Sequence, residues 1–464
     1  MENAGIHVVI LAAGQGTRMK SNEPKVLHAL AGISMIDHVL RAASSLNPTT
    51  VTAIIGHKAE IVRSHLQGRQ KVSTVVQEPQ LGTAHALQQT ESILAGLSGT
   101  VVLLSGDVPL LRASTLHQLA ETHRRANAAA TVVTATVERP YGYGRIVRSG
   151  GRIVRIVEER DASPAERQIR EINSGIYAFD LPPLFDALRS IASQNAQLEF
   201  YLTDLVGIYR RRKLPVETLA VANPDEIRGI NSRTELAEVS RIVRQNKNEE
   251  LMAAGVTLID PATTYIDADV EVGPDTVIHP GVVLEGQTRI GPACEIQAHV
   301  RIVDSTIGSH VSVNSFCLIV GATVADGAAV GPFAHLRPES VVGEKAKVGN
   351  FVELKKTTLG AGSKANHLAY LGDADIGANV NIGAGTIICN YDGQTKHQTS
   401  IEEGAFIGSD TQLIAPVTIG RGAYVGTGTT VREDVPPGAL AVSAGKQRNI
   451  EGWVARKRDA ATKS

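Results

Sequence analysis

The sequence predicts three parts in order: an α/β domain with a mostly parallel sheet, a linker helix, and a parallel, left-handed β-helix of hexapeptide repeats. Three observations carry this prediction. Short apolar runs alternate with amphipathic segments in the first half, a helix-capping pattern stands near the middle, and an aliphatic residue recurs at every sixth position through most of the second half. We therefore place the three parts at residues 1–233, 234–254 and 255–464.

Apolar runs and helix-length segments alternate over roughly the first half of the chain. Three runs predict strands, at 7–11, 51–55 and 101–104, and amphipathic segments such as 35–46 and 83–94 predict helices. This alternation favours a Rossmann-like sheet that is mostly parallel and covered by helices on both faces. Ligands of such sheets bind beyond the carboxyl ends of the strands, so the segments that follow the strands are the candidate site.

A capping box marks the start of the linker helix. Ser232 and Glu235 have the Ser-x-x-Glu spacing, apolar residues follow at Leu236, Val239 and Val243, and Gly255 is the expected stop. A helix of about twenty residues is roughly 30 Å long, and we expect it to join the two domains.

The sixfold repeat predicts the β-helix, because neither an α-helix nor an ordinary strand has this period. Each hexapeptide supplies a short strand and a corner, with its aliphatic side chain inward, and three hexapeptides complete a triangular coil of about eighteen residues. The longest runs are Ile266, Val272, Ile278, Leu284, Ile290, Ile296 and Ile302, and Val324, Val330, Leu336, Val342, Val348 and Leu354.

The repeat slips by one residue at four places, so we expect the coils to restart there. The slips fall at 302–307, 319–324, 354–359 and 371–376. A gap of thirteen residues separates Ile388 from Ile401 and contains Asn390–Gly393, which predicts a loop that projects from the prism. A rigid spacer or an oligomerisation stalk is the alternative interpretation of the repeat.

Composition limits the classes of partner. The chain has 46 basic and 47 acidic side chains, so bulk charge predicts neither nucleic acid nor an anionic membrane as a ligand. Its three cysteines are too few and too scattered for a disulfide framework or a zinc site. The sequence has no signal-peptide pattern and no apolar stretch long enough to span a bilayer, so we expect a cytoplasmic protein.

Small residues and two cations follow the first predicted strand. Backbone N–H groups of Leu11–Gly14 can approach a phosphate closely, and Arg18 and Lys25 can neutralise triphosphate charge. The spacing is not that of a Walker loop. By itself, a glycine-rich turn after a strand is often only a tight turn.

Two later segments support a nucleotide site. One combines Gln77 with Gly82 and Thr83, and the other is Ser105–Asp107, where a carboxylate follows a buried strand. Asp107 is well placed to hold Mg²⁺ that bridges nucleotide phosphates, although an aspartate there could also be an ordinary helix cap.

In this order, the motifs resemble the sugar-phosphate nucleotidylyltransferases. The segments 141–146, 157–159 and 171–175 look like the sugar-binding elements of these enzymes. Together with the hexapeptide half, the chain from about His7 to Trp453 resembles the family of bifunctional N-acetylglucosamine-1-phosphate uridyltransferases and glucosamine-1-phosphate N-acetyltransferases. The resemblance covers nearly the whole chain.

The resemblance implies a uridylyl-transfer site in the first domain. There the sugar phosphate attacks the α-phosphorus of UTP and expels pyrophosphate; no general base is needed, and Lys25, Arg18 and Mg²⁺ neutralise charge. Many relatives have Tyr where this chain has Ser105, so a side-chain contact there stays open. The implied nucleotide contacts are Leu11, Ala12, Ala13, Gly14, Lys25, Gln77, Gly82, Thr83, Ser105, Gly106 and Asp107; the sugar contacts are Gly144, Glu158, Asn173 and Thr203; the metal ligands are Asp107 and Asn231.

Repeat spacing predicts a phosphate site in the β-helix without any resemblance. Arg337 and Lys355 are eighteen residues apart, one coil, so they should stack on the same edge and bind one phosphate together. Otherwise two like charges would stack without a partner. In 364–370 the inward aliphatic is replaced by Ala365, and we expect His367 to share one cleft with the two cations.

The resemblance implies acetyl transfer at that cleft. A lone histidine is more often structural than catalytic, but here His367 is implied as the general base. Some relatives carry Arg where Ala444 stands, so Lys446 or Arg448 would have to replace that contact with the coenzyme. Tyr370 and Asn381 are implied to orient the sugar, and the implied acetyl-CoA contacts are Ala384, Asn390, Tyr391, Ser409, Thr427 and Ala444.

The sequence therefore predicts a cytoplasmic, bifunctional enzyme that acetylates glucosamine 1-phosphate with acetyl-CoA and then uridylylates N-acetylglucosamine 1-phosphate with UTP and Mg²⁺, a source of UDP-N-acetylglucosamine for cell-wall precursors. The resemblance implies a homotrimer through the β-helix with shared coenzyme sites. Two alternatives stay open: a nucleotidylyltransferase whose β-helix only oligomerises, and a non-enzymatic scaffold that binds sugar nucleotides.

Overall fold

The computed structural model describes residues 5–69, 72–443, 445, 447 and 449–461. The chain forms two compact units, Met1–Val243 and Arg244–Ser464. Helix α8 (Arg233–Ala253) contains the boundary, since Val239 packs in a cluster with Met19 and Met35 of the first unit while Leu251 packs in the core of the β-helix. Within the part of the chain that the structure describes, no helix has the length and apolar character needed to cross a membrane.

The expected capping box begins α8. Ser232 Oγ accepts from Glu235 N at 3.3 Å, and Glu235 Oε2 accepts from Ser232 N at 3.1 Å. Beyond the helix, Gly255 has a φ of 95°, and its N–H donates to Met252 O at 3.1 Å. The predicted start and stop signals are therefore both confirmed.

The first unit is built on a nine-stranded sheet with the order β11-β7-β10-β6-β1-β4-β5, and the β8–β9 hairpin joins it at β10. The sheet is parallel except for β10 and the hairpin. All three predicted runs are strands in it. The bounds are β1 Gly5–Ala12, β4 Thr50–Ile55, β5 Val72–Val76, β6 Gly99–Ser105, β7 Ala130–Thr136, β8 Arg145–Ser149, β9 Arg152–Val157, β10 Glu171–Asp180 and β11 Val216–Ala220.

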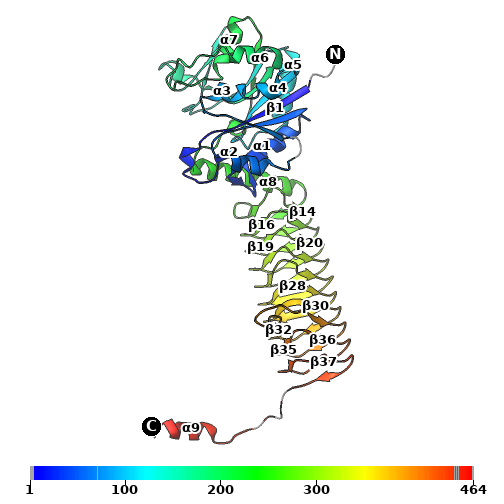
Figure 1. Ribbon diagram of the computed structural model, residues 1–464. Helices are drawn as coiled ribbons and strands as arrows, with labels where there is room; N and C mark the ends of the chain where they lie inside the picture. Colours follow the sequence, from blue (N-terminus) through cyan, green and yellow to red (C-terminus); the bar gives the residue numbers. More distant parts are fainter. Residues whose placement is uncertain (1–4, 70–71, 444, 446, 448, 462–464) are drawn as a thin grey trace. The chain divides into compact units, whose positions relative to one another are not determined.

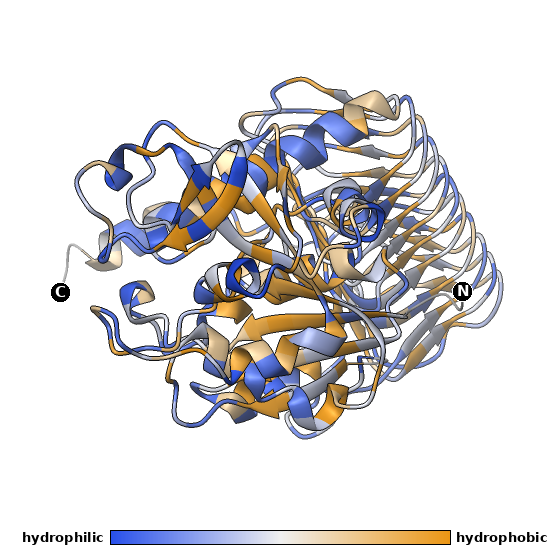
Figure 2. Cartoon of the chain, turned by 90° about the horizontal axis from the view of Figure 1, so that it is seen from above, coloured by the Kyte–Doolittle hydropathy of each residue, from blue (hydrophilic) through white to orange (hydrophobic). Residues whose placement is uncertain are grey.

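Helices cover both faces of this sheet. One apolar cluster joins the sheet to α1 (Met35–Ser44), α2 (Ala59–Leu66) and α5 (Ala113–Arg125), and a second joins it to α3 (Thr83–Gln88), α6 (Leu181–Leu188) and α7 (Asp204–Arg211). The central strands are strongly hydrophobic in Figure 2, whereas the helices carry polar faces.

The predicted helix at 83–94 is wrong in one respect, because it is two short helices. α3 ends at Gln88, and α4 (Glu91–Leu94) follows. Between them the buried Thr90 hydroxyl donates to Leu87 O at 2.7 Å. Such a side-chain bond competes with the helical ladder and favours a break.

The second unit is a β-helix of short strands that runs from β12 (Thr257–Leu258) to β39 (Leu440–Ala441) and is drawn as a stack of coils in Figure 1. Its described strands form an eleven-stranded and a seventeen-stranded sheet, and the repeat aliphatics fill one continuous core. The strand register confirms the coil length, because Leu336 pairs with Leu354, eighteen residues later. It also confirms the slips, because Leu354 pairs with Leu371, which is one residue short of a full coil. Ile382 pairs with Ile407 because the predicted loop is inserted between them.

One corner of the β-helix carries an exposed column of stacked rings. His299, Phe316, Phe333 and Phe351 follow one another on successive coils, with ring centroids 5.1 to 5.3 Å apart. The three phenylalanine side chains are 47 to 56% exposed. The stacked rings form one continuous exposed patch, whereas exposed apolar residues on a protein surface are usually scattered singly.

Burial of His123 makes stability depend on pH in the first unit. This side chain is 4% exposed, bonds the Thr131 hydroxyl at 3.0 Å, and has its pKa lowered by burial to about 4. Below the ordinary pKa of about 6.5 the unfolded chain binds a proton that the folded chain does not, so His123 should cost about 2 kcal/mol of stability between pH 7 and pH 5.

We expect His123→Gln to lose less stability than the wild type over that pH interval. Urea unfolding of both proteins at pH 7 and pH 5 measures the difference. Equal losses would contradict the assignment of the effect to His123.

Candidate active sites

A cavity of about 480 Å³ lies at the carboxyl ends of β1 and β6. The two strand ends are held together because Gly106 N donates to Leu11 O at 2.9 Å. Gln15, Gln80 and Glu199 also line the cavity, and the sequence motifs did not predict them as site residues. The predicted residues that line it are Leu11, Ala12, Ala13, Gly14, Lys25, Gln77, Gly82, Thr83, Ser105 and Asp107.

Gly82 is required by the close approach of two segments. Its φ is 111°, and a Cβ there would lie 2.6 Å from the backbone oxygen of Phe200. The buried Gln77 amide donates to Gly82 O at 2.9 Å. These contacts hold in place the part of the cavity wall that contains Gln77, Gly82 and Thr83.

Lys25, Asp107 and Asn231 converge beside this cavity. Lys25 Nζ forms an ion pair with Asp107 Oδ2 and donates to Asn231 Oδ1 at 3.0 Å. Ile230 N donates to Asp107 O at 3.0 Å, and Asn231 N donates to Glu235 Oε2 at 2.6 Å. The capping glutamate of α8 therefore also holds the loop that carries Asn231.

The donor set fits a magnesium ion. Asp107 and Asn231 offer carboxylate and amide oxygens, both directed at one ammonium group. No group of three or more His, Cys, Asp or Glu side chains among the described residues is arranged to hold a metal. Two protein ligands suit an ion that takes its other ligands from substrate phosphates and water.

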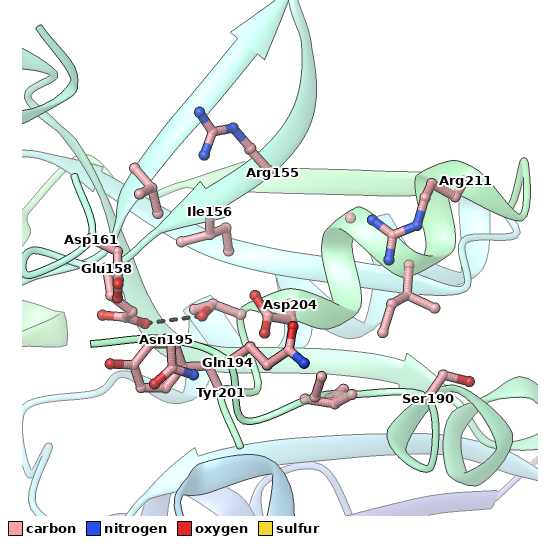
Figure 3. Close-up of a pocket in the computed structure, with 16 residues that line it drawn as sticks. Arg155, Ile156, Glu158, Asp161, Ser190, Gln194, Asn195, Tyr201, Asp204 and Arg211 are labelled. Atoms are coloured by element: carbon pink, nitrogen blue, oxygen red, sulfur yellow. Dashed lines mark hydrogen bonds between the residues drawn. The ribbon is translucent and has the colours of Figure 1, made fainter. Parts of the chain in front are cut away.

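The four residues implied in sugar binding lie together. Asn173 N donates to Gly144 O at 2.9 Å, and Thr203 Oγ1 donates to Glu158 Oε1 at 3.0 Å, the bond drawn in Figure 3. A Cβ on Gly144 would lie 3.5 Å from Glu158 Oε1. Burial raises the pKa of Glu158, and the Thr203 bond partly opposes this.

Arg18 is exposed and is not part of the described cavity wall. It belongs to the 3₁₀ helix η1 (Thr17–Met19), where its side chain is exposed. It does not line the 480 Å³ cavity, whereas Lys25 does. Of the two predicted cations, only Lys25 therefore belongs to the described wall of this cavity.

Arg337 and Lys355 stack on one edge of the β-helix, as their spacing predicts. They follow β25 (His335–Leu336) and the start of β28 (Glu353–Leu359), and both line a cavity of about 840 Å³. The expectation that they lack partners is wrong. Arg337 lies 3.0 Å from Glu353, and Lys355 lies 3.6 Å from Asp373.

The sequence analysis missed Lys396 at this cavity. The loop before β33 (Thr399–Ile401) brings Lys396 and His397 to the cavity wall. The neighbouring Lys355 ammonium lowers the pKa of Lys396. The loop itself is held by Asp392, which accepts from Gln394 N, Thr395 N and His397.

His367 lies on a different corner, so the prediction of one shared cleft within a single chain is wrong. It ends β29 (Lys364–His367), in the eleven-stranded sheet, whereas β25 and β28 belong to the other sheet. Lys355 and His367 are twelve residues apart, which is two hexapeptides and not a full coil. His367 does not line the 840 Å³ cavity.

The residues implied in acetyl-CoA binding mostly share the corner of His367. Register pairs Ala365 with Ile382, Ile382 with Ile407, and Ile407 with Val425. Two residues after each of these, the chain reaches His367, Ala384, Ser409 and Thr427. Ala444, Lys446 and Arg448 lie outside the described residues.

Of the other implied residues, Tyr370 lies on the face between the two corners, Asn390 and Tyr391 belong to the projecting loop, and Asn381 lies in the eleven-stranded sheet. A Cβ on Gly372 would lie 2.6 Å from Tyr370 Oη and 2.8 Å from Asn390 Nδ2, and Asn390 Nδ2 also donates to Asp373. Tyr391 is exposed on the loop, and its hydroxyl donates to Gly393 O at 2.6 Å. Asn381 begins β31 (Asn381–Ile382), one coil beyond Lys364.

Comparisons with known proteins cover both units. Residues 7–250 match the nucleotidyl transferase family, 262–359 a GMPPB C-terminal domain, and 398–433 six repeats of the bacterial transferase hexapeptide. The bifunctional protein GlmU of Trichlorobacter lovleyi is 51% identical over 452 residues, covering 97% of this chain and 98% of the relative. This chain belongs to the GlmU family. The GlmU proteins of Pelobacter propionicus and Streptomyces avermitilis are 50% and 48% identical, covering 98% and 97% of this chain and 98% and 94% of those relatives.

Family membership decides between the open alternatives. The chain is a bifunctional enzyme of UDP-N-acetylglucosamine synthesis, with nucleotidyltransferase and acetyltransferase activities. The β-helix of a GlmU protein is therefore more than an oligomerising stalk, and the scaffold alternative is wrong.

Proposed function

We propose that the α/β unit transfers the uridylyl group of UTP to N-acetylglucosamine 1-phosphate beside Asp107, and that the β-helix acetylates glucosamine 1-phosphate at a site completed by a second copy of the chain. The convergence of Lys25, Asp107 and Asn231 beside the cavity at the ends of β1 and β6 carries the first assignment. We place the enzyme in the cytoplasm, with Mg²⁺ as its metal and acetyl-CoA as the acetyl donor.

Uridylyl transfer at this site needs positioning and charge neutralisation. An oxygen of the sugar phosphate attacks the α-phosphorus of UTP, a P–O bond forms, and the bond to the pyrophosphate group breaks. Bound Mg²⁺, held by Asp107 and Asn231, supplies positive charge to the phosphates. The Ala12–Gly14 backbone and Lys25 hold the nucleotide.

The sugar-binding cluster supplies the other reactant. Hydrogen bonds join Asn173 to Gly144 and Thr203 to Glu158, and we assign these four residues to the N-acetylglucosamine hydroxyl and amide groups. We assign Gln77, Gly82, Thr83 and Ser105, which line the cavity, to the nucleotide, together with Gly106 directly after β6. Arg18, exposed in η1, would act only on phosphate oxygens that reach beyond the cavity.

Loss of Lys25 should slow uridylyl transfer strongly. We expect Lys25→Ala to lower kcat by about 10²–10³, the usual cost of removing one preorganised electrostatic group. Pyrophosphate release measures this rate, and acetyl transfer by the same protein should not change. Lys20→Ala, which removes an exposed lysine of the same loop, is the matched control. A loss below threefold would contradict the role of Lys25.

In the β-helix, the groups needed for acetyl transfer are divided between two corners. The segment 367–372 separates them and is roughly 16 Å long at about 3.3 Å per residue. Glucosamine 1-phosphate is too short for its amine to reach His367 while its phosphate lies between Arg337 and Lys355 of the same chain. We therefore assign the base and the phosphate-binding cations of one site to different copies in a homotrimer.

The exposed aromatic column supports contact between copies. Phe351 is the last ring of the column, and the next coil continues the same corner with Leu368, directly after His367. An apolar surface beside the proposed base is suited to packing against a neighbouring chain. Such packing would bring the 840 Å³ cavity of one copy toward His367 of another.

The acetyl-transfer step is proposed as general-base catalysis. The substrate amine attacks the thioester carbonyl of acetyl-CoA, a C–N bond forms, and the C–S bond breaks with release of the coenzyme thiolate. His367 takes the proton that the amine loses. Tyr370 and Asn381 orient the sugar, while Ala384, Asn390, Tyr391, Ser409 and Thr427 line the coenzyme groove.

A coupled assay tests both assignments. The purified protein receives glucosamine 1-phosphate, acetyl-CoA, UTP and Mg²⁺, and free thiol and pyrophosphate are followed separately. We expect thiol release with acetyl-CoA alone as co-substrate, and pyrophosphate release only after acetylation. Pyrophosphate release without Mg²⁺, or from unacetylated substrate at the full rate, would contradict the proposed chemistry.

A further inference from the structure

One side chain contacts the proposed base directly and has no role in the assignments above. Asn350 Oδ1 lies 2.7 Å from His367 Nδ1. The two residues are register partners on successive coils, at the ends of β27 (Lys347–Asn350) and β29. The contact therefore comes from stacking of the coils and does not depend on a mobile loop.

The backbone fixes Asn350 in place. Leu368 N donates to Asn350 O at 3.0 Å, and the neighbouring Phe351 ring stacks on Phe333 at 5.2 Å. Asn350 is partly buried, whereas His367 is exposed. The amide is thus the more constrained member of the pair, and the imidazole takes its orientation from it.

We propose that Asn350 is a positioning residue for acetyl transfer, which holds His367 in the tautomer with a proton on Nδ1 and a free lone pair on Nε2. An amide oxygen can only accept, so the imidazole must donate from Nδ1. Nε2 is then the nitrogen that is left to take the proton of the amine. This inference rests on the proposed role of His367 as the general base.

A neutral partner has a consequence that a carboxylate would not have. An amide orients the ring without adding a negative charge beside it, so it does not stabilise the imidazolium form. None of the ion pairs formed by the described residues involves His367.

Two substitutions separate orientation from structure. Asn350→Ala removes the acceptor, and we expect kcat of acetyl transfer to fall about 10- to 100-fold with little change in KM, a smaller loss than removal of the base itself. Asn350→Asp keeps the acceptor and adds charge. It should retain most of kcat but move the acidic limb of the kcat–pH profile upward by about one unit, because a carboxylate favours the protonated ring.

Controls and a direct measurement make the test decisive. Asn366→Ala, which changes the residue next to His367, is the matched control and should leave kcat within about threefold. Long-range ¹H–¹⁵N spectra of histidine-labelled full-length protein should show His367 protonated on Nδ1 in the wild type. Protonation on Nε2, or Asn350→Ala and Asn350→Asp profiles identical to that of the wild type, would overturn the inference.

Failure of the inference differs from failure of the proposed function. If His367→Ala retains acetyl transfer, the general-base assignment is wrong. If His367→Ala is inactive while Asn350→Ala has full activity and an unshifted pH profile, only the positioning role is wrong.

Discussion

Replacement of His367 by Ala should lower kcat of acetyl transfer by about 10²–10⁴ and leave uridylyl transfer unchanged. The amine of glucosamine 1-phosphate must lose a proton as it attacks the thioester, and His367 lies on the corner that also carries Ala384, Ser409 and Thr427. Free-thiol release measures the loss, and pyrophosphate release from N-acetylglucosamine 1-phosphate and UTP measures the unaffected activity.

The independence of the two readouts follows from their location. His367 belongs to the second compact unit, while Lys25, Asp107 and Asn231 belong to the first. His310→Ala, which removes another exposed corner histidine of the β-helix, is the matched control and should retain both activities. If acetyl transfer by His367→Ala stays within about fivefold of the wild type, another group must accept the proton.

The fold could be predicted from the sequence because its strongest signal is local. Each coil requires inward aliphatic side chains at every sixth residue, whatever the other coils contain. The positions of Leu336, Leu354 and Leu371 in the sequence therefore predict which residues pair between coils. The phase slips and the loop before Ile401 could also be predicted, because each of them interrupts the six-residue period. In the first unit, the residues that follow β1 and β6 were predicted because strand ends have a fixed place in a parallel sheet.

Side-chain partners were not predictable in this way. Glu353 and Asp373 neutralise Arg337 and Lys355, and their pairing depends on rotamers at a corner that the period does not describe. Lys396 reaches the same cavity from an inserted loop that has no repeat at all. Glu199 and Gln80 line the nucleotide cavity from segments without a periodic pattern.

The misplacement of His367 has a different cause. The spacing of eighteen residues that stacks Arg337 on Lys355 also implies that a residue twelve positions further along lies on another corner. The predicted shared cleft follows the period for the first pair but ignores it for His367. Applied throughout, the same rule separates the base from the cations and indicates that one chain does not complete the site.

Mixing two inactive variants should therefore restore acetyl transfer. His367→Ala lacks the base but keeps the phosphate-binding cations, and Lys355→Ala lacks one cation but keeps the base. In a trimeric ring with head-to-tail interfaces, a complete site forms wherever a copy with His367 faces a copy with Lys355, so about one third of the sites are complete in every mixed trimer. Activity should rise from near background to about that fraction of the wild-type rate.

The restoration depends on which chain supplies each group, and this gives the experiment its control. The two variants are co-expressed with different affinity tags, mixed assemblies are isolated through both tags, and thiol release is measured. His367→Ala co-expressed with the double variant His367→Ala/Lys355→Ala contains no base in any copy and should stay inactive. If the mixed single variants are equally inactive although both chains are present, the base and the cations of one site belong to the same chain, and the long separation between the two corners must be closed by a rearrangement within it.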